Sequence, residues 1–184
     1  MKCYVHIAVR RLFLNLLIIS ALFFASACNQ YYTDQNIEIK EDGLIYKVGR
    51  DDPYTGRIID TLLNKIVEYD VVNGMKNGEF RLSSDEGIVS VYGSIEDNRN
   101  IGEWKYFYPN GQLESTGNFN YDNPHGKWVW YYYDGSIKET GTFLNGNKTG
   151  TWYRYSWEGI LLSITMYDEG EKINEIKFNP SIKV

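Results

Sequence analysis

The side chains that could carry acid–base or covalent chemistry are few and scattered in this sequence. The chain has two histidines, His6 near its start and His125, which directly precedes a glycine. Neighbouring acids occur at Asp51-Asp52, Asp85-Glu86, Glu96-Asp97 and Asp168-Glu169. Carboxylate pairs can hydrolyse glycosidic bonds, but these pairs lie in segments typical of turns, where Asp is favoured for backbone reasons. Calcium binding at these loops is an alternative, although their spacing does not match the pattern of a calcium loop.

The histidines and cysteines do not combine into a catalytic or metal-binding set. His6 lies in an N-terminal segment that we expect to be removed, which leaves His125 alone. One histidine without a second partner supplies neither a Ser-His-Asp arrangement nor a zinc site. We therefore interpret His125 as a turn residue between two hairpins. The prediction is a protein that is not an enzyme and has no catalytic residues, no cofactor and no metal.

The first 27 residues have the pattern of an export signal. Lys2, Arg10 and Arg11 give a positive start, and residues 12–24 form an apolar run that is short for a spanning helix, which needs roughly 20 residues. Ala25-Ser26-Ala27-Cys28 follows and resembles a bacterial lipoprotein cleavage site, with Ala25 where leucine is commoner. This resemblance implies that Cys28 becomes the lipid-carrying N-terminus. Asn29 after it, rather than Asp, is compatible with sorting to an outer membrane.

Charge and cysteine content exclude several classes of partner. The whole chain has 19 basic and 24 acidic residues, and loss of residues 1–27 removes three basic ones, so the net charge goes from −5 to −8. This balance argues against nucleic acid or an anionic bilayer surface as the main ligand. Cys3 is lost with the signal and Cys28 carries lipid, so no thiol is left for a disulfide or a nucleophile.

The remaining chain is a repeat with a step of 24 residues. Gly102-Glu103-Trp104 recurs as Gly126-Lys127-Trp128 and as Gly150-Thr151-Trp152, and Gly78-Glu79-Phe80 lies one step upstream. Two further rows keep the step, Gly87, Gly111, Gly135 and Gly159, then Gly93, Gly117 and Gly141 with Thr165 as fourth member. Three rows in register predict a repeat architecture with units starting near residues 56, 78, 102, 126 and 150.

Each unit contains two alternating segments, which predict two strands. Asn110-Gly111, Asp134-Gly135 and Glu158-Gly159 stand between them, and Asn-Gly and Asp-Gly suit two-residue type I′ hairpin loops. Such a loop at Asn110-Gly111 would pair Trp104 with Gly117, Tyr106 with Ser115, and Tyr108 with Leu113. The same rule pairs Trp128 with Gly141 and Phe80 with Gly93. We expect each indole to lie across the glycine that it pairs with, so that Phe80, Gly93, Trp104, Gly117, Trp128, Gly141 and Trp152 form the structural core.

The units at the two ends are less regular. Residues 28–41 are polar, and we interpret them as the lipidated cysteine and a tether, with an extra edge strand around Ile37 and Ile39 as the alternative. Residues 43–52 resemble half a unit that caps the array. In the unit from residue 56 the turn glycine is missing and Tyr69 occupies the glycine row. A last strand begins near Glu175. Residues 42–184 show no linker and are predicted to form one repeat domain.

The residues of the repeat also resemble a known family. Gly-x-Trp-x-x-Tyr-Tyr-x-Asn/Asp-Gly followed by x-Gly-x-Phe, best written in residues 102–125 and 126–149, is similar to the bacterial variant of the MORN (membrane occupation and recognition nexus) repeat. Proteins called YwqK-like antitoxins are built of this repeat. The resemblance covers about residues 43–178 and implies an all-β fold, an elongated single-layer antiparallel sheet of tandem hairpins, used for binding rather than catalysis.

A row of rings on the face opposite the tryptophans is the candidate binding surface. It consists of Phe107, Tyr131 and Tyr155, extended at two turns by Tyr133 and Trp157. Tyrosine and tryptophan among charges are typical of protein interfaces, whereas stability of a single-layer sheet, or a homodimer, would also account for them. We expect a lipoprotein of the bacterial cell envelope, in the outer membrane if the cell has two, that binds a protein partner. An antitoxin-type neutraliser and a cell-wall or carbohydrate-binding module are the alternatives.

Overall fold

In the computed structural model the described residues, 36–179, form strands and turns without a helix. No helix among them is long and apolar enough to cross a membrane. Residues 1–27 and Cys28 lie outside the described range, so the expected signal peptide and lipid site have no structural counterpart here. The strands are β1 (Ile37–Ile39), β2 (Ile45–Lys47), β3 (Gly56–Leu62), β4 (Lys65–Val72), β5 (Met75–Ser84), β6 (Val89–Glu96), β7 (Arg99–Phe107), β8 (Leu113–Asn120), β9 (Asn123–Tyr131), β10 (Ile137–Leu144), β11 (Asn147–Tyr155), β12 (Leu161–Asp168) and β13 (Glu171–Lys177).

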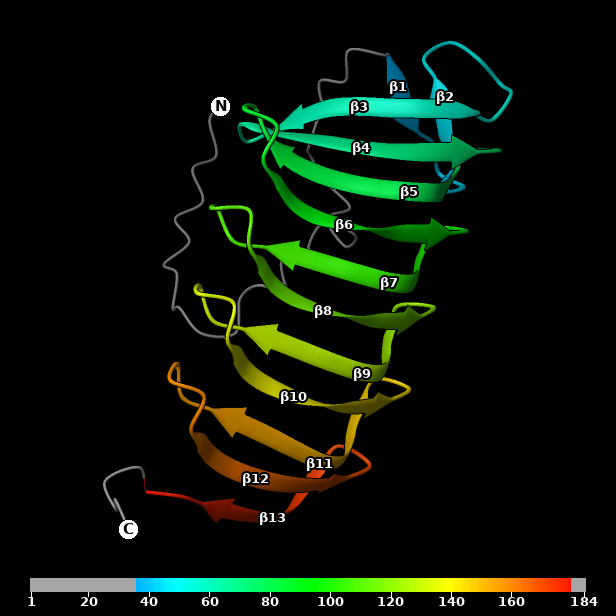
Figure 1. Ribbon diagram of the computed structural model, residues 1–184. Helices are drawn as coiled ribbons and strands as arrows, with labels where there is room; N and C mark the ends of the chain where they lie inside the picture. The colour runs from blue at the N-terminus through cyan, green and yellow to red at the C-terminus, as the bar shows by residue number, and fades with distance from the viewer. Residues whose placement is uncertain (1–35, 180–184) are drawn as a thin grey trace, which may run out of the picture. The chain divides into compact units, whose positions relative to one another are not determined.

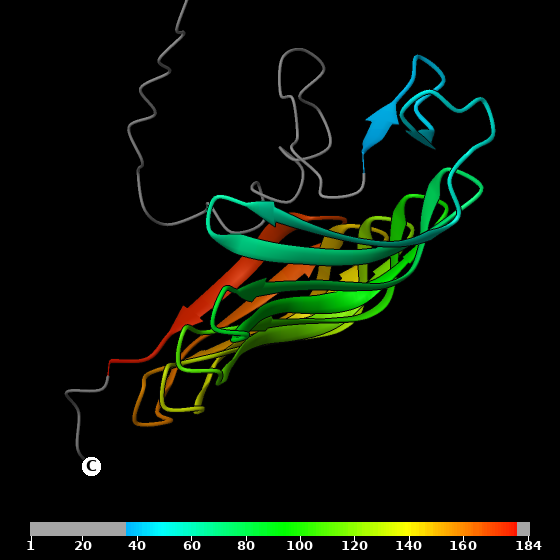
Figure 2. The same cartoon turned by 90° about the horizontal axis from the view of Figure 1, so that it is seen from above.

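Eleven of these strands build one open antiparallel sheet in chain order from β3 to β13. Each strand pairs with its neighbours in sequence, so the sheet grows by successive hairpins (Figure 1). Viewed from above, the strand direction turns gradually along the row (Figure 2), the usual twist of β-structure. The predicted fold class, tandem hairpins in a single-layer antiparallel sheet, is confirmed.

From β5 onwards the two edges of the sheet carry different turns, and the predicted turn type is wrong at the edge where it was placed. On that edge only the turn between β3 and β4, Leu63-Asn64, has a positive φ at both of two loop positions. In the hairpin of β7 and β8, the Gly111 amide donates to the Tyr108 carbonyl (2.8 Å) and the Tyr108 amide to the Gln112 carbonyl (2.8 Å). Only Gly111 in this loop has a positive φ, +82°. This is a three-residue loop made of a type I turn and a glycine bulge. The hairpins of β9 with β10 and β11 with β12 repeat it.

Two-residue loops with positive φ at both positions occur instead between the units. They lie at Asn73-Gly74, Asp97-Asn98, Tyr121-Asp122, Asn145-Gly146 and Glu169-Gly170. Two of the five are Asn-Gly, the strongest sequence signal for a type I′ loop, so this edge could have been found from the sequence.

The longer loop explains both the success and the failure of the predicted register. Trp104 pairs with Gly117 and Tyr106 with Ser115 as expected, but Leu113 pairs with Phe107 and not with Tyr108. The three-residue loop shifts the pairing by one residue, and a bulge after Leu113 shifts it back. The pairs Trp128 with Gly141 and Phe80 with Gly93 also hold.

The first glycine of each regular unit lies at a β-bulge between consecutive units. Gly78, Gly102, Gly126 and Gly150 have φ values of +109°, +63°, +72° and +63°. At each of them the pairing with the preceding strand slips by two residues. A left-handed backbone is inexpensive for glycine only, which gives this row of the repeat a backbone function.

The end of the segment expected to be a tether, residues 28–41, contains a strand. Ile37–Ile39 is a strand that pairs with β2 in a separate two-stranded sheet, so the strand alternative holds, although not as an added strand of the array. Ile45 of β2 is buried with Ile58 and Val71 of the large sheet, and its amide donates to the Gly74 carbonyl (2.9 Å). The hairpin thus packs on the first unit of the array. Tyr69 occupies the glycine position of that unit, paired with Ile58 and Phe80.

Candidate binding surface

The three aligned indoles are buried on one face of the sheet. Trp104, Trp128 and Trp152 are 1%, 1% and 2% exposed. Their ring nitrogens donate to backbone carbonyls of the preceding unit, at 3.1 Å for Trp104 to Ser94 and 3.1 Å for Trp128 to Asn118. These indoles are therefore satisfied structural groups and unavailable to a ligand.

Each indole lies over a glycine, but over that of the preceding hairpin. A Cβ added at Gly93 would stand 2.2 Å from Trp104, one at Gly117 2.1 Å from Trp128, and one at Gly141 2.1 Å from Trp152. The expectation that Trp104 covers Gly117, its partner within the hairpin, is wrong. The register is as predicted, but the ring leans towards the other neighbouring strand. Consequently the Trp–Gly contact joins consecutive units.

The face that carries these indoles, called here the tryptophan face, is a continuous row of rings. Trp104 stacks with Phe80 at 5.5 Å between centroids, and Trp128 with Trp130 at 5.6 Å. Edge-to-face contacts fill the gaps, such as Phe119 with Trp128 at 5.2 Å and Phe143 with Trp152 at 5.0 Å. Trp128 and Trp130 lie in the same strand, β9, but the other three contacts join different strands. The row therefore connects units that are otherwise joined only by strand pairing.

The predicted ring row on the opposite face divides into two groups. Phe107, Tyr131 and Tyr155 are half-buried within the strands, whereas Tyr133 and Trp157 are 57% and 65% exposed in hairpin turns. Phe107 borders an open hollow of about 540 Å³ with Arg81 and Tyr92. The five residues are therefore not one platform, and the accessible rings are those of the turns.

The turns of the hairpins form a second surface, the hairpin-turn edge, comprising residues 63–64, 85–87, 109–111, 133–135 and 157–159 and the residues beside them. The Tyr108 hydroxyl donates to the Tyr131 carbonyl (2.7 Å), and the Tyr132 hydroxyl to the Tyr155 carbonyl (2.8 Å). Exposed apolar side chains on this edge are Leu63, Ile88, Tyr133, Ile137, Trp157 and Ile160. The two tyrosine hydrogen bonds link each hairpin to the next one and fix the positions of consecutive turns.

Sequence reasoning missed Tyr108 and Tyr132 as the residues that hold this edge together. Tyr108 and Tyr132 are 24 residues apart, which is the step of the repeat, and they directly precede Pro109 and Tyr133. The repeat step therefore identifies them as equivalent positions of two units. The Tyr133 ring contacts that of Tyr108 at 5.2 Å between centroids. The Ser136 hydroxyl adds a bond to the Trp157 carbonyl at 3.1 Å.

The hairpin-turn edge carries more acidic than basic side chains, the exposed lysines beside its turns being Lys65 and Lys138. Asp85, Glu86, Asp134 and Glu158 lie in its turns and are exposed. Hydrogen bonds from the Ser136 hydroxyl (2.7 Å) and amide (2.9 Å) lower the pKa of Asp134, so this carboxylate is charged at neutral pH. Rings and negative charge therefore occur together on one edge.

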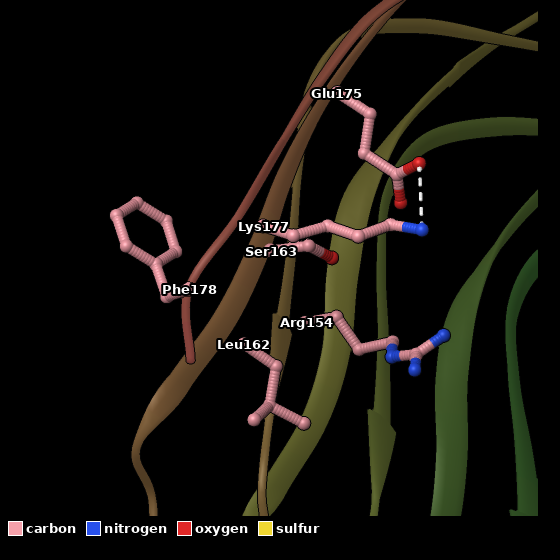
Figure 3. Close-up of a pocket in the computed structure, with 6 residues that line it drawn as sticks. All are labelled: Arg154, Leu162, Ser163, Glu175, Lys177 and Phe178. Carbon is pink, nitrogen blue, oxygen red and sulfur yellow. Dashed lines mark ion pairs between the residues drawn. The ribbon is translucent and has the colours of Figure 1, made fainter. Parts of the chain in front are cut away.

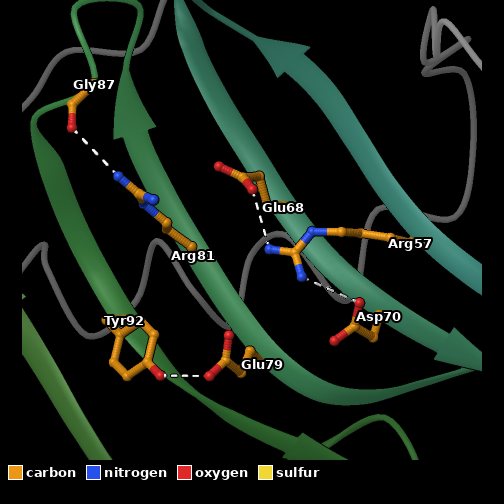
Figure 4. Close-up of polar contacts among 7 residues, drawn as sticks. All are labelled: Arg57, Glu68, Asp70, Glu79, Arg81, Gly87 and Tyr92. Carbon is orange, nitrogen blue, oxygen red and sulfur yellow. Dashed lines mark hydrogen bonds and ion pairs between the residues drawn. The ribbon is translucent and has the colours of Figure 1, made fainter.

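On the face opposite the tryptophans, the first strands carry a network of charged groups (Figure 4). Arg57 bonds Glu68 at 3.1 Å and Asp70 at 3.4 Å. The Tyr92 hydroxyl donates to Glu79 at 2.8 Å, and this bond raises the pKa of Tyr92. These groups satisfy one another at the surface, which is an arrangement for stability and solubility.

The candidate catalytic groups are placed apart. His125 lies in β9, three residues after Asp122, and not in the turn where it was expected. The paired acids within the described range lie in or beside turns and bends, as the sequence predicted. Between residues 36 and 179 no group of three or more His, Cys, Asp or Glu side chains is arranged to hold a metal ion.

A polar hollow of about 260 Å³ lies at the C-terminal end of the sheet. Figure 3 shows Arg154, Glu175 and Lys177 projecting to the same side, with Glu175 and Lys177 3.5 Å apart. Lys172 also contacts Glu175, at 3.1 Å, and lowers its pKa. The acid is thus neutralised by two lysines, and the hollow is a charged end to the row of rings on the tryptophan face.

An open sheet of successive hairpins with a 24-residue step, each joined to the last by an indole on a glycine, defines a β-hairpin repeat protein. Residues 101–121 and 124–145, which span most of β7–β8 and β9–β10, match the MORN repeat variant. The match supports a MORN-type repeat protein, a kind of repeat that often serves in protein or membrane interaction. No curated protein shows a significant match to the sequence.

Proposed function

We propose that this chain is a non-catalytic protein-interaction module, held at the bacterial cell envelope by lipid on Cys28, and that its partner docks on the hairpin-turn edge. The observation that carries the proposal is the exposure of Tyr133 and Trp157, 57% and 65%, on turns that the Tyr108 and Tyr132 hydroxyls hold together. Large exposed rings on a rigid base are typical of interaction hot spots.

Most other aromatic residues are more buried than Tyr133 and Trp157, and the exposed tyrosines Tyr92, Tyr121 and Tyr153 are 38%, 46% and 37% exposed. The tryptophan face is occupied by its own stacked rings, and the indoles of Trp104, Trp128 and Trp152 lie on glycines. Phe107, Tyr131 and Tyr155 of the original ring row are half-buried and support the sheet. A partner that meets the rings of the turns does not have to displace any of them.

The envelope location rests on the sequence alone. The charged start, the apolar run and Ala25-Ser26-Ala27-Cys28 are the features that favour lipid attachment and export. A chain anchored there would meet a cytoplasmic toxin only before export, so the neutraliser alternative is the less favoured one.

The test is an affinity pull-down from the native envelope with the soluble part of the chain as bait, followed by mass spectrometry. The bait is compared with the double variant Tyr133→Ala/Trp157→Ala and with Tyr121→Ala, which removes an exposed ring from the opposite edge. The expected result is one enriched protein that is lost with the double variant and kept with Tyr121→Ala. Circular dichroism establishes that the sheet is intact in each bait.

Other results would point to the alternatives. Enrichment of wall fragments without a protein would favour carbohydrate binding, and rescue of growth against a toxic partner would favour a neutraliser. A partner captured equally by the double variant would move the site to another face and contradict the hairpin-turn edge.

A further inference from the structure

Resting on the proposed function, we propose that the hairpin-turn edge recognises an extended, proline-rich segment that carries lysine or arginine. The ligand would lie along the row of turns in the polyproline II conformation. Its proline rings would pack on Tyr133 and Trp157, and its cations would lie near the carboxylates of the same turns.

The spacing of the turns selects this conformation. The turn of Tyr133 joins β9 to β10 and that of Trp157 joins β11 to β12, so the two rings are two strands apart in the sheet. Neighbouring strands are about 4.8 Å apart, which gives a step of about 9.6 Å. A polyproline II helix has three residues per turn and rises about 3.1 Å per residue, so that it repeats every 9.3 Å or so. Every third residue of such a ligand would meet the next turn.

Other peptide conformations fit this step less well. Two turns of an α-helix advance about 10.8 Å, and an extended strand returns to the same face after about 6.7 Å or about 13.4 Å. Both differ more from about 9.6 Å than the polyproline II period of about 9.3 Å does. Aromatic rings are also the surfaces on which proline-rich segments dock in other domains.

The Tyr133 ring and the backbone of the Trp157 turn are held in place before any ligand arrives. Tyr133 contacts Tyr108, whose hydroxyl is bonded to the Tyr131 carbonyl of the next hairpin. The carbonyl of Trp157 accepts a bond from Ser136 of the preceding hairpin. A polyproline segment is itself stiff, so the loss of conformational freedom on binding is small for both partners.

The charges of the edge select a basic ligand. Asp85, Glu86, Asp134 and Glu158 lie along it, and the lowered pKa of Asp134 keeps that carboxylate ionised. A neutral glycan would stack on the same rings but would gain nothing from four carboxylates. The attraction of a cationic ligand falls with added salt, which gives the proposal a second observable.

The experiment titrates the full chain, purified in mild detergent, with a decaproline peptide that has arginine at both ends. Binding is followed by tryptophan emission, because Trp157 is 65% exposed while Trp130 is half-buried and Trp104, Trp128 and Trp152 are buried. Control ligands are a glycine-serine peptide with the same arginines, a decaproline with glutamate at both ends, and a chitooligosaccharide. The protein variants are Tyr133→Ala, Trp157→Ala and Tyr121→Ala, with heat of binding as the signal where Trp157 is absent.

The expected result is saturable binding of the arginine-flanked decaproline, weaker for the glutamate-flanked one and weaker in high salt. Tyr133→Ala and Trp157→Ala should each weaken binding by about tenfold, equal to about 1.4 kcal/mol, and Tyr121→Ala should leave it unchanged. Equal binding of the glycine-serine peptide, binding of the sugar in place of the peptide, or no binding of decaproline would overturn the inference. If decaproline fails while the pull-down partner still depends on Tyr133 and Trp157, the interaction function stands and only the ligand class is wrong.

Discussion

The contact between Gly117 and Trp128 should decide the stability of two adjacent units, and Gly117→Ala tests it. The new Cβ would stand 2.1 Å from Cδ2, 2.3 Å from Cε2 and 2.4 Å from Cγ of the Trp128 indole. Carbon atoms in contact are about 3.5–4.0 Å apart, so the ring would have to move by about 1.5 Å. It has little room, because Phe119 and Trp130 pack on it at 5.2 and 5.6 Å between centroids.

The cost can be bounded from both sides. If the ring shifts within its surroundings, overpacking costs about 1–3 kcal/mol. If the ring is expelled, the lost burial of about 150–250 Å² of indole at about 25 cal/mol per Å² corresponds to about 4–6 kcal/mol. We therefore expect Gly117→Ala to lower the free energy of unfolding by about 2–5 kcal/mol. Urea denaturation followed by circular dichroism measures it.

A double-mutant cycle separates the two tryptophans that flank Gly117. In a Trp128→Ala background the added methyl group finds space, so Gly117→Ala should cost little there. In a Trp104→Ala background its cost should be undiminished, although Trp104 is the paired residue across the hairpin. Trp→Leu replacements serve if either alanine variant does not fold. Coupling to Trp104 and not to Trp128, or a Gly117→Ala variant as stable as the original chain, would refute the arrangement of rings on glycines.

Two further predictions concern a strained turn and a buried hydroxyl. Leu63 has a φ of +49° and is 90% exposed, so Leu63→Asn should raise the urea midpoint, with a gain of about 0.5–1 kcal/mol, while Leu63→Ala, which keeps the steric conflict, should give none. Burial raises the pKa of Tyr106; the folded state therefore keeps a proton that the unfolded state releases above about pH 10, and stability should fall as pH rises past that value. Urea midpoints across this range should depend less steeply on pH in Tyr106→Phe, and an identical slope in both proteins would contradict the burial of that hydroxyl.

Most of the fold could be predicted because period-two alternation and a 24-residue step are local, repeated signals. The Trp104 and Gly117 pair followed from them. The type of the Gly111 loop did not, since Asn-Gly suits both a type I′ loop and a type I turn with a glycine bulge, and the choice depends on the bulge after Leu113. The direction of each indole was also beyond the sequence, because a residue in an inner strand has two neighbouring strands and pairing within the hairpin identifies only one.

The candidate surface was predicted in part for a similar reason. Alternation places Phe107, Tyr131 and Tyr155 on the face opposite the tryptophans, but it does not say how deeply each ring is buried by its neighbours. The turns were the informative place: Tyr133 and Trp157 stand in loop positions where no strand can cover them, and they are the two exposed members of the predicted set.

The end of the array shows how one residue of the repeat controls which face a strand presents. Asn174 stands where Gly78, Gly102, Gly126 and Gly150 allow a two-residue slip, and it does not adopt a positive φ. The pairing of β13 with β12 therefore slips by only one residue, so that Thr165 meets Glu175 and not Ile176. A change of register by one residue exchanges the two faces of a strand. Ile176, at the tryptophan position of the repeat, becomes 51% exposed, and Glu175 and Lys177 border the hollow at the end of the sheet. With Asn174 in place of glycine, charged side chains follow the row of indoles on the tryptophan face. The apolar side chain at the next tryptophan position, Ile176, lies on the other face.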